Sequence, residues 1–354
     1  MKLFNFPFVV QREIIKKMSI SEVFLLSLCS SKTTDFIHRI RWKELKSIRF
    51  SFVGSILYVT CEIKNVIENE DIFEIRRTYQ PRLPMHKWTI STILGVETCI
   101  GFIKVSKKLK QLYVCLLNET LDGPIAEAIQ KQIELIFGNH LKYELRTHDT
   151  SEGFLPKLTN IRNSILSPNE AKRLDEMFSA SPNHDLVVML GPIGGRFPSN
   201  SGIYNTKLLK IGKSGSIADD VLYHFKGKRA HLLEGIVSQK SIIHFIQKWI
   251  SNERFHNLEM FSVKVPDPNF FENAKDEIKK HFAFHRFDPK EIPAFRCCEN
   301  FVTNGYWEHP PLVSGEYVVR DSDGSLASVD LYNNIFSFVV LNSKVVNQVR
   351  TNIG

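Results

Sequence analysis

The residues that could bind a phosphate group lie in two glycine-containing segments near the middle of the sequence. Residues 212–214 read Gly-Lys-Ser, which is the end of a phosphate-binding loop, where backbone amides and the lysine surround the phosphates. That mechanism requires a glycine five positions before Gly212, but this chain has Lys207 there. The second segment, residues 191–195, is not followed at once by a capped helix, because residues 198–202 intervene. We therefore interpret both segments as loops.

Two further patterns have the residue types of metal ligands. His281 and His285 have the spacing that places two imidazoles on one helix face, but Phe282 stands where a metalloprotease has its glutamate base. Residues 321–324 read Asp-Ser-Asp-Gly, like the start of a calcium loop, yet the twelfth position is Tyr332 instead of a bidentate glutamate. We predict ordinary core or surface histidines and a hairpin turn, with no metal and no cofactor.

No pattern of nucleophilic residues indicates an enzyme. The sequence contains no Gly-x-Ser-x-Gly elbow, and no cysteine has the surroundings of a known nucleophile. The cysteines, at positions 29, 61, 99, 115, 297 and 298, include no Cys-x-x-Cys pair, which is typical of reduced cysteines in a protein that is not secreted. We predict a non-catalytic protein without disulfides and without a zinc site.

Composition and charge narrow the class of protein. With 354 residues, 43% of them hydrophobic and 24% charged, the chain is globular and longer than one typical domain. The 46 basic and 38 acidic residues give a net charge of +8, which favours nucleic acid or an acidic protein as partner. The basic runs at residues 104–110 and 226–229 lack interleaved aromatic residues, so we interpret them as solvated faces. Without a secretion signal or a membrane-spanning run, we expect a cytoplasmic and/or nuclear protein.

The first forty or so residues have the clearest pattern. Apolar residues recur every four positions at Val10, Ile14 and Met18, which predicts a helix over residues 8–18 with one apolar face. That face requires a partner surface. A structural alternative is a helical hairpin that merely packs on the rest of the chain.

Two more short helices follow in the sequence. Ser19 and Glu22 form the pattern of a capping box, in which each side chain bonds the backbone N–H of the other residue. A second helix should start there, and residues 33–41 predict a third. A unit of about forty residues usually needs a metal, a disulfide or a partner for stability. We favour a partner.

These N-terminal residues resemble the F-box in the form common in nematode families. The resemblance covers residues 3–42, with a Phe-Pro lead at Pro7 and the pattern Glu-x-x-x-Leu-Ser-Leu-Cys-Ser-x-Lys at residues 22–32. It implies docking on a Skp-family adaptor and, through that adaptor, on a cullin. The positions that it assigns to adaptor contacts are Pro7, Ile14, Leu26 and Leu28, with Lys32 near the rim.

The remainder of the chain alternates between patterns of strands and helices. A hairpin is predicted over residues 47–63, and Ile125, Ile129, Ile133 and Ile136 share one face of a helix that Gly123 and Pro124 open. Further strands are predicted at residues 112–117, 141–145, 185–190, 207–211, 231–233, 258–265, 316–320, 326–331 and 336–341. Further helices are predicted at residues 217–225 and 273–284. Two more helices are predicted, one after a cap at Ser167 with Glu170 and one after a cap at Ser238.

These patterns predict an α+β or α/β fold. A small three-helix F-box precedes a larger domain of repeated strand-helix units with a parallel sheet, which resembles an irregular leucine-rich-repeat arc. We predict three parts, an F-box at residues 3–46, a linking region at residues 47–205 and a C-terminal domain at residues 206–345. Trp249 has apolar neighbours at helical spacing, so we place it in the core.

The C-terminal part is similar to the nematode F-box-associated domain of type 2. The residues that carry this similarity are Leu222, His231, Leu232, Phe245, Trp249, Ile250, Leu258, Arg320, Asp323 and Gly324. The resemblance implies that this domain recruits a protein substrate.

The leading hypothesis is therefore a non-catalytic substrate-recognition subunit of an SCF-type cullin ubiquitin ligase. The alternatives are a basic nucleic-acid-binding protein, a nucleotide-dependent enzyme that uses the loops at Gly191 and Lys213, and an F-box protein that acts outside a ligase. The sequence identifies neither the substrate nor any need for its phosphorylation.

Overall fold

A computed structural model describes residues 3–40, 42–54, 56–64, 70–77, 89–93, 96–104, 110–116, 123–148, 155–286 and 315–341. The chain divides into two compact units. Unit 1 comprises Met1–Ser167 with Glu176–Asn183, and unit 2 comprises Pro168–Asp175 with His184–Gly354. Cys297 and Cys298 lie outside the described residues, as does the central part of the basic run at residues 104–110.

Unit 1 begins with a single 3-10 turn, η1 (Leu3–Asn5), and three short helices. These are α1 (Phe8–Lys16), α2 (Ile20–Leu28) and α3 (Ser31–Arg39). A mixed sheet and the helix α4 (Gly123–Phe137) follow. The strands are β1 (Leu45–Val53), β2 (Ile56–Ile63), β3 (Glu70–Arg77), β4 (Thr89–Ile93), β5 (Val96–Lys104), β6 (Lys110–Leu116), β7 (Lys142–His148) and β8 (Ile161–Leu166).

The pairing of these strands combines hairpins with long-range parallel contacts. β1 and β2 form the predicted antiparallel hairpin, β2 continues to β3, and β4, β5 and β6 form a meander. β6 then pairs parallel to β3, β7 parallel to β1, and β8 parallel to β7. The sheet order within the unit is therefore β4-β5-β6-β3-β2-β1-β7-β8.

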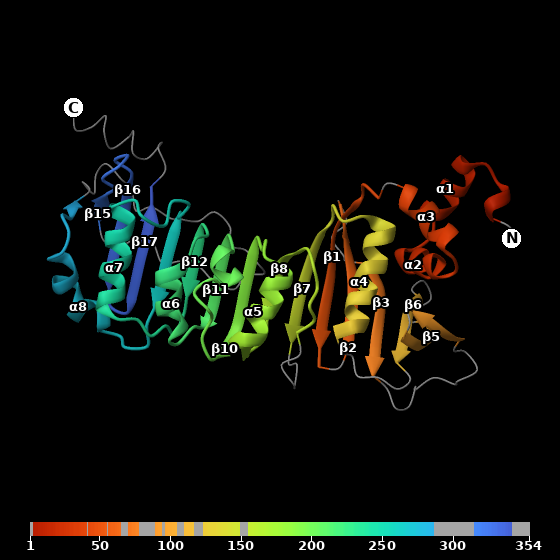
Figure 1. Ribbon diagram of the computed structural model, residues 1–354, viewed down its shortest axis with the longest axis horizontal. Helices are drawn as coiled ribbons and strands as arrows, with labels where there is room; N and C mark the ends of the chain where they lie inside the picture. Colours follow the sequence, from red (N-terminus) through yellow and green to blue (C-terminus); the bar gives the residue numbers. More distant parts are fainter. Residues whose placement is uncertain are drawn as a thin grey trace. The chain divides into compact units, whose positions relative to one another are not determined.

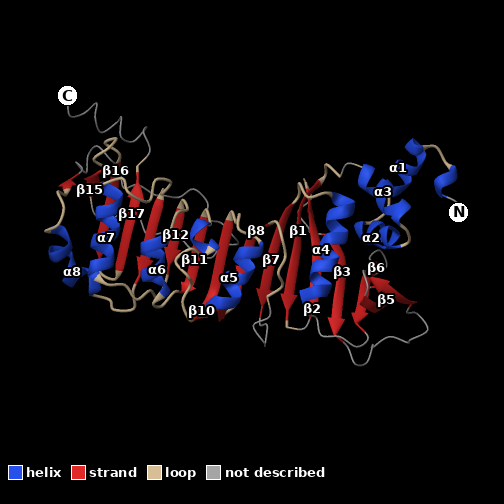
Figure 2. Ribbon diagram, viewed as in Figure 1, coloured by secondary structure: helices blue, strands red, loops and turns tan. Residues whose placement is uncertain are grey.

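The core of unit 1 lies between this sheet and α4, which is drawn in front of the strands in Figures 1 and 2. All four isoleucines predicted on one face of α4 are buried. The helix ends because Gly138 adopts a positive φ of +88°, a conformation that favours glycine, and its N–H bonds the Glu134 carbonyl. The Tyr143 hydroxyl donates to the Gly138 carbonyl at 3.2 Å, which places the Tyr143 side chain on the same face of the sheet as α4.

Unit 2 contains a sheet that is parallel in its first half and antiparallel in its second. The strands are β9 (Asn169–Glu170), β10 (Leu186–Gly194), β11 (Leu208–Lys213), β12 (Arg229–Leu232), β13 (Met260–Lys264), β14 (His285–Arg286), β15 (Glu316–Val319), β16 (Leu326–Tyr332) and β17 (Ile335–Val340). β9 to β13 pair in parallel in sequence order, and β17, β16, β15 and β14 follow β13 antiparallel. The predicted parallel sheet with a C-terminal hairpin is confirmed.

Helices cover one face of this second sheet. They are α6 (Ile217–His224), α7 (Gln239–Ile250) and α8 (Phe270–Lys279), and the chain also forms α5 (Ala171–Ala180) and a short turn, η3 (Gly202–Asn205). Figure 2 shows α6 and α7 on the same side of the strands. Together with the three N-terminal helices and the mixed sheet of unit 1, these elements confirm the α+β class.

The core of unit 2 is rich in aromatic side chains. Phe245 on α7 contacts Phe261 of β13 and Phe338 of β17, with ring centroids 5.0 Å and 5.2 Å away. Trp249 is fully buried against Phe338, as the sequence predicts. The Arg320 guanidinium lies over the tryptophan ring, with its carbon 5.1 Å from the ring centroid.

The turn that follows Arg320 is the predicted hairpin turn. Arg320 donates to both carboxylate oxygens of Asp323, and the Ser325 N–H donates to the same carboxylate at 2.9 Å. These bonds lower the pKa of Asp323, with the Arg320 hydrogen bond as the largest cause. Gly324 has a positive φ of +66°. The carboxylate that looked like a calcium ligand therefore stabilises a turn between β15 and β16.

Three helix starts are wrong in the sequence prediction. The helix start predicted at Ser167 is wrong because Asn169 and Glu170 pair with β10 as strand β9, and α5 begins only at Ala171. The helix predicted at residues 273–284 spans Phe270–Lys279 instead. The third N-terminal helix also starts earlier than predicted, because Ser30 caps it.

Candidate functional site

The first helix of the candidate site begins at Pro7. Pro7 is the N-cap of α1, and its carbonyl accepts a hydrogen bond from the Gln11 N–H at 3.1 Å. The Gln11 side chain donates back to the Phe6 carbonyl, so the segment before the helix is attached to its first turn. Gln11 and Ile15 form the buried face of α1.

The second and third helices are fixed by serine caps. Ser19 and Glu22 form the predicted capping box, with bonds of 3.3 Å and 2.9 Å between each side chain and the other residue's N–H. Ser30 accepts a hydrogen bond from the Thr33 N–H at 3.2 Å and so starts α3. The Thr34 hydroxyl donates to the Ser27 carbonyl at 2.7 Å, which holds α3 against the end of α2.

An aromatic cluster joins the N-terminal residues to α3. Phe4 and Phe8 both contact Phe36 edge-to-face, with ring centroids 5.9 Å and 5.6 Å away. The Lys32 ammonium lies 4.8 Å from the centroid of the Phe4 ring. These contacts pack Phe4 and Phe8 against α3.

Apolar side chains remain exposed next to this cluster. Val9 has an exposed fraction of 59%, and four neighbours are also exposed, namely Phe4, Phe6, Phe8 and Val10. Several exposed apolar residues in one short segment make a candidate interaction surface. We name these five residues the N-terminal apolar surface.

The same three helices pack firmly on the rest of unit 1. Phe24 of α2 stacks at a tilt on Phe73 of β3, with ring centroids 4.7 Å apart. The Gln132 side chain of α4 donates to the Ser27 hydroxyl at 2.9 Å, a buried bond between residues 105 positions apart. Trp42 contacts Phe137 edge-to-face at 5.3 Å. The N-terminal helices are therefore part of one compact unit with the sheet.

Comparison with known protein families assigns this helical segment. Residues 3–44 match the F-box domain family. The matched F-box covers α1 to α3, so the capped helices and the exposed apolar side chains belong to a recognised module. No curated protein and no solved structure matches the chain significantly. The comparison therefore assigns the F-box and gives no name to the larger part of the fold.

The residues predicted to contact an adaptor all lie within the F-box, in different environments. Pro7 and Lys32 are exposed, whereas Ile14, Leu26 and Leu28 are half-buried. The structure brings Lys32 together with Phe4, which sequence reasoning did not select. Sequence reasoning also missed Phe8 and Val9, although the apolar run from Phe6 to Val10 was a visible signal.

The loops that looked like nucleotide sites have other roles in the fold. The buried Ser214 hydroxyl donates to the Leu233 carbonyl at 2.8 Å. Asp219 and Asp220 occupy the first turn of α6, where their carboxylates would repel a phosphate. Arg196 pairs with Asp220 through two hydrogen bonds, so this basic group is already bound to a carboxylate.

The remaining candidate ligands do not assemble into a site. His281 follows the end of α8 and His285 begins β14, so the two imidazoles do not share a helix face. His285 stacks on Tyr317 with ring centroids 5.2 Å apart. Among the residues that the structure describes, no group of three or more His, Cys, Asp or Glu side chains could hold a metal. Within the same residues, no helix is both long enough and apolar enough to span a membrane.

Proposed function

We propose that the chain is a substrate-recognition subunit of an SCF-type cullin ubiquitin ligase. Its F-box binds a Skp-family adaptor, the adaptor binds the cullin, and the remainder of the chain recruits a protein target. The observation that carries this proposal is the family match at residues 3–44, over three helices that leave an apolar surface exposed. The subunit contributes to catalysis by proximity, because it holds the target near the ubiquitin-charged enzyme.

The adaptor contacts in this proposal are the positions that the resemblance to the F-box assigns. Pro7, Ile14, Leu26 and Leu28 contribute apolar contacts, and Lys32 lies near the rim. The exposure of Phe8 and Val9 adds them to this surface. Buried apolar anchors dominate the affinity of such interfaces, whereas charges at the rim mainly affect the rate of association.

The target-recruiting part of this proposal derives from the sequence. Residues 206–345 act as an F-box-associated domain of type 2, and residues 47–205 connect it with the F-box. A nematode-type origin, a cytoplasmic or nuclear location and the absence of a cofactor belong to the same proposal.

The experiment that tests this function is co-purification of the chain with a Skp-family adaptor. We expect Val9→Asp to weaken adaptor binding at least about tenfold, because a charge replaces an exposed apolar contact at the interface. Leu135→Asp is the matched control, because Leu135 is a similarly exposed aliphatic residue on α4 of the same unit. Both sites are exposed, so neither variant should unfold the chain. A Pro7→Ala, Leu28→Asp double variant tests the exposed Pro7 together with the half-buried Leu28.

Failure of the folded wild-type chain to bind any Skp-family adaptor would reject the ligase role. Nucleic-acid binding, the alternative that the net charge of +8 favours, would then be tested by its dependence on salt. In the basic run at residues 226–229, Lys228 and Arg229 both pair with Glu259, which offsets part of that charge. If the chain binds an adaptor but supports no ubiquitin transfer in a reconstituted complex, it acts outside a ligase.

A further inference from the structure

The sheet of unit 1 has a second face, turned away from α4, which we name the outer face. Tyr143 contacts the end of α4, so the alternate residues Glu144 and Arg146 of β7 point to the opposite side. Arg49 of β1 is directly opposite Glu144 in the register of the two parallel strands. The buried neighbour of Arg49, Phe50, contacts Tyr143 on the α4 side. The outer face therefore carries these three charged side chains.

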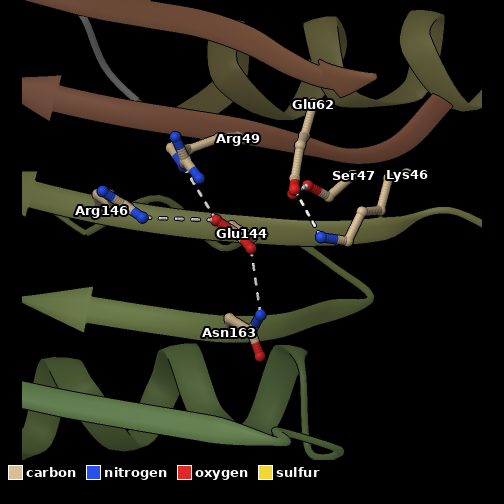
Figure 3. A network of polar contacts seen from close by, with 7 residues as sticks. All are labelled: Lys46, Ser47, Arg49, Glu62, Glu144, Arg146 and Asn163. Carbon is tan, nitrogen blue, oxygen red and sulfur yellow. Dashed lines mark hydrogen bonds and ion pairs between the residues drawn. The ribbon is translucent and has the colours of Figure 1, made fainter. Parts of the chain in front are cut away.

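Two guanidinium groups converge on one carboxylate at this face (Figure 3). Arg49 Nε donates to Glu144 Oε2 at 2.9 Å, and Arg146 Nη2 lies 3.8 Å from the same oxygen. The other Glu144 oxygen accepts a hydrogen bond from Asn163 of β8 at 3.2 Å. The side chains retain exposed fractions of 18% for Arg49, 14% for Glu144 and 25% for Arg146. They are accessible but partly removed from water.

The charges at this point are not balanced within the described part of the chain. The two arginines and Glu144 sum to one net positive charge. Glu62 also interacts with Arg49, but Lys46 pairs with the Glu62 carboxylate, so these two residues together leave the net charge unchanged. Arg146 Nε is buried and has no hydrogen-bond partner among the described residues. Burial, and then the positive charge of Arg49, lower the pKa of Arg146, while Glu144 raises it.

We propose that Arg49 and Arg146 form a binding site for a carboxylate side chain of the protein target, on the outer face of unit 1. This inference rests on the proposed function for the identity of the partner as a recruited protein. An incoming carboxylate would bring the local charge to zero and would accept hydrogen bonds from the planar N–H groups of the two arginines.

The charge of the site favours a carboxylate over a phosphate group. A phosphorylated side chain carries about two negative charges at neutral pH. It would leave the site with a net negative charge beside Glu144, which would repel it. The ligand is therefore an acidic side chain, from aspartate or glutamate, on a segment that lies along the exposed strands.

The test measures binding of the full-length chain to a fluorescein-labelled Gly-Ser peptide with central glutamates, by fluorescence anisotropy. We expect Arg146→Gln to weaken binding about tenfold, which corresponds to loss of a charge-assisted hydrogen bond. The matched control is Arg162→Gln on β8, because Arg162 is exposed and bonds only the Asn183 carbonyl among the described residues. That control should change affinity less than about twofold. A peptide with glutamine in place of glutamate should not bind.

Glu144→Gln provides a test with the opposite sign. Removal of the internal carboxylate leaves both arginines available to the ligand, so this variant should bind the glutamate peptide more tightly than wild type. A destabilised protein would not show that gain. Equal losses in the Arg146 and Arg162 variants, weaker binding by the Glu144 variant, or no binding by wild type would overturn the proposal.

A second peptide, with phosphoserine in place of the glutamates, distinguishes the two kinds of anion. Tighter binding of the phosphopeptide would overturn the choice of a carboxylate. None of these measurements requires the adaptor. Loss of the acidic-peptide site and loss of adaptor binding are therefore separate outcomes, and only the second rejects the ligase role.

Discussion

Lys210 is a lysine in an almost fully buried position. It lies on β11 between Val188 and His231 of the neighbouring strands, and only 5% of its surface is exposed. Burial lowers the pKa of Lys210 from its ordinary value of 10.5 to about 8. The position therefore makes the stability of unit 2 depend on pH.

The direction of this dependence follows from proton linkage. Between pH 8 and pH 10.5 the unfolded chain holds more protons at Lys210 than the folded chain, so stability rises with pH in this window. We expect Lys210→Met to remove that rise, which amounts to no more than about 3.4 kcal/mol. Urea unfolding at several pH values measures it. Lys213→Met, at the exposed end of the same strand, should keep the rise. If the free energy of unfolding of the Lys210 variant still rose with pH as in wild type, the linkage would be contradicted.

At the scale of single residues, sequence reasoning succeeded where local spacing determined the environment. Trp249 was placed in the core because its apolar neighbours recur at helical spacing, and it is fully buried. The Arg49–Glu144 pair could not be predicted, because its residues are 95 positions apart and meet only through the parallel pairing of β1 with β7. The contacts of Phe4 and Phe8 with Phe36 were missed because they also join residues that are far apart in the sequence.

At the scale of elements, the capping box of α2 has a measurable effect. Ser19→Ala removes the acceptor for the Glu22 N–H, so we expect a loss of about 1 kcal/mol in the free energy of unfolding. Ser31→Ala is the matched control, because Ser31 is exposed at the start of α3 and Ser30 is the cap there. Thermal unfolding of both variants measures the difference. Equal losses of unfolding free energy in the two variants would show that the Ser19 cap does not stabilise the protein.

Most elements were predicted well because their signals are local. The cap at Ser238 and the apolar face of α4 depend only on residues within a few turns of helix, and both are confirmed. The helix start at Ser167 failed because Asn169 and Glu170 pair with Ile193 and Gly194 of β10, more than 20 residues away. A cap pattern predicts a helix only when strand pairing does not take the residues that follow the cap.

At the scale of the whole molecule, the F-box is expected to unfold together with the sheet of unit 1. Phe24→Ala removes the contact with Phe73 and should cost about 3 to 5 kcal/mol, because it leaves a cavity between α2 and β3. Hydrogen exchange should speed up in both elements. Phe8→Ala, at an exposed F-box position, should cost much less. Faster exchange confined to α2 would show that the F-box opens independently.

The class of the fold was predictable from alternating strand and helix patterns, but the sheet order was not. The predicted three-part division at residues 46 and 205 stays a prediction. Nothing in the sequence of β3 indicates that it pairs with β6, because the signal of a strand does not name its neighbour. The packing of the F-box on α4 depends on the same kind of long-range contact.

The buried bond between Ser27 and Gln132 also affects the order of events during synthesis. These residues are 105 positions apart, so the F-box leaves the ribosome long before the helix against which it packs. Until α4 has been made, the side of α2 that faces Gln132 lacks one of its partners, and the N-terminal apolar surface is exposed as well. The nascent F-box therefore presents the N-terminal apolar surface together with a side of α2 that still lacks its partner. An adaptor or chaperone that binds there early would protect the chain from aggregation before its sheet is complete.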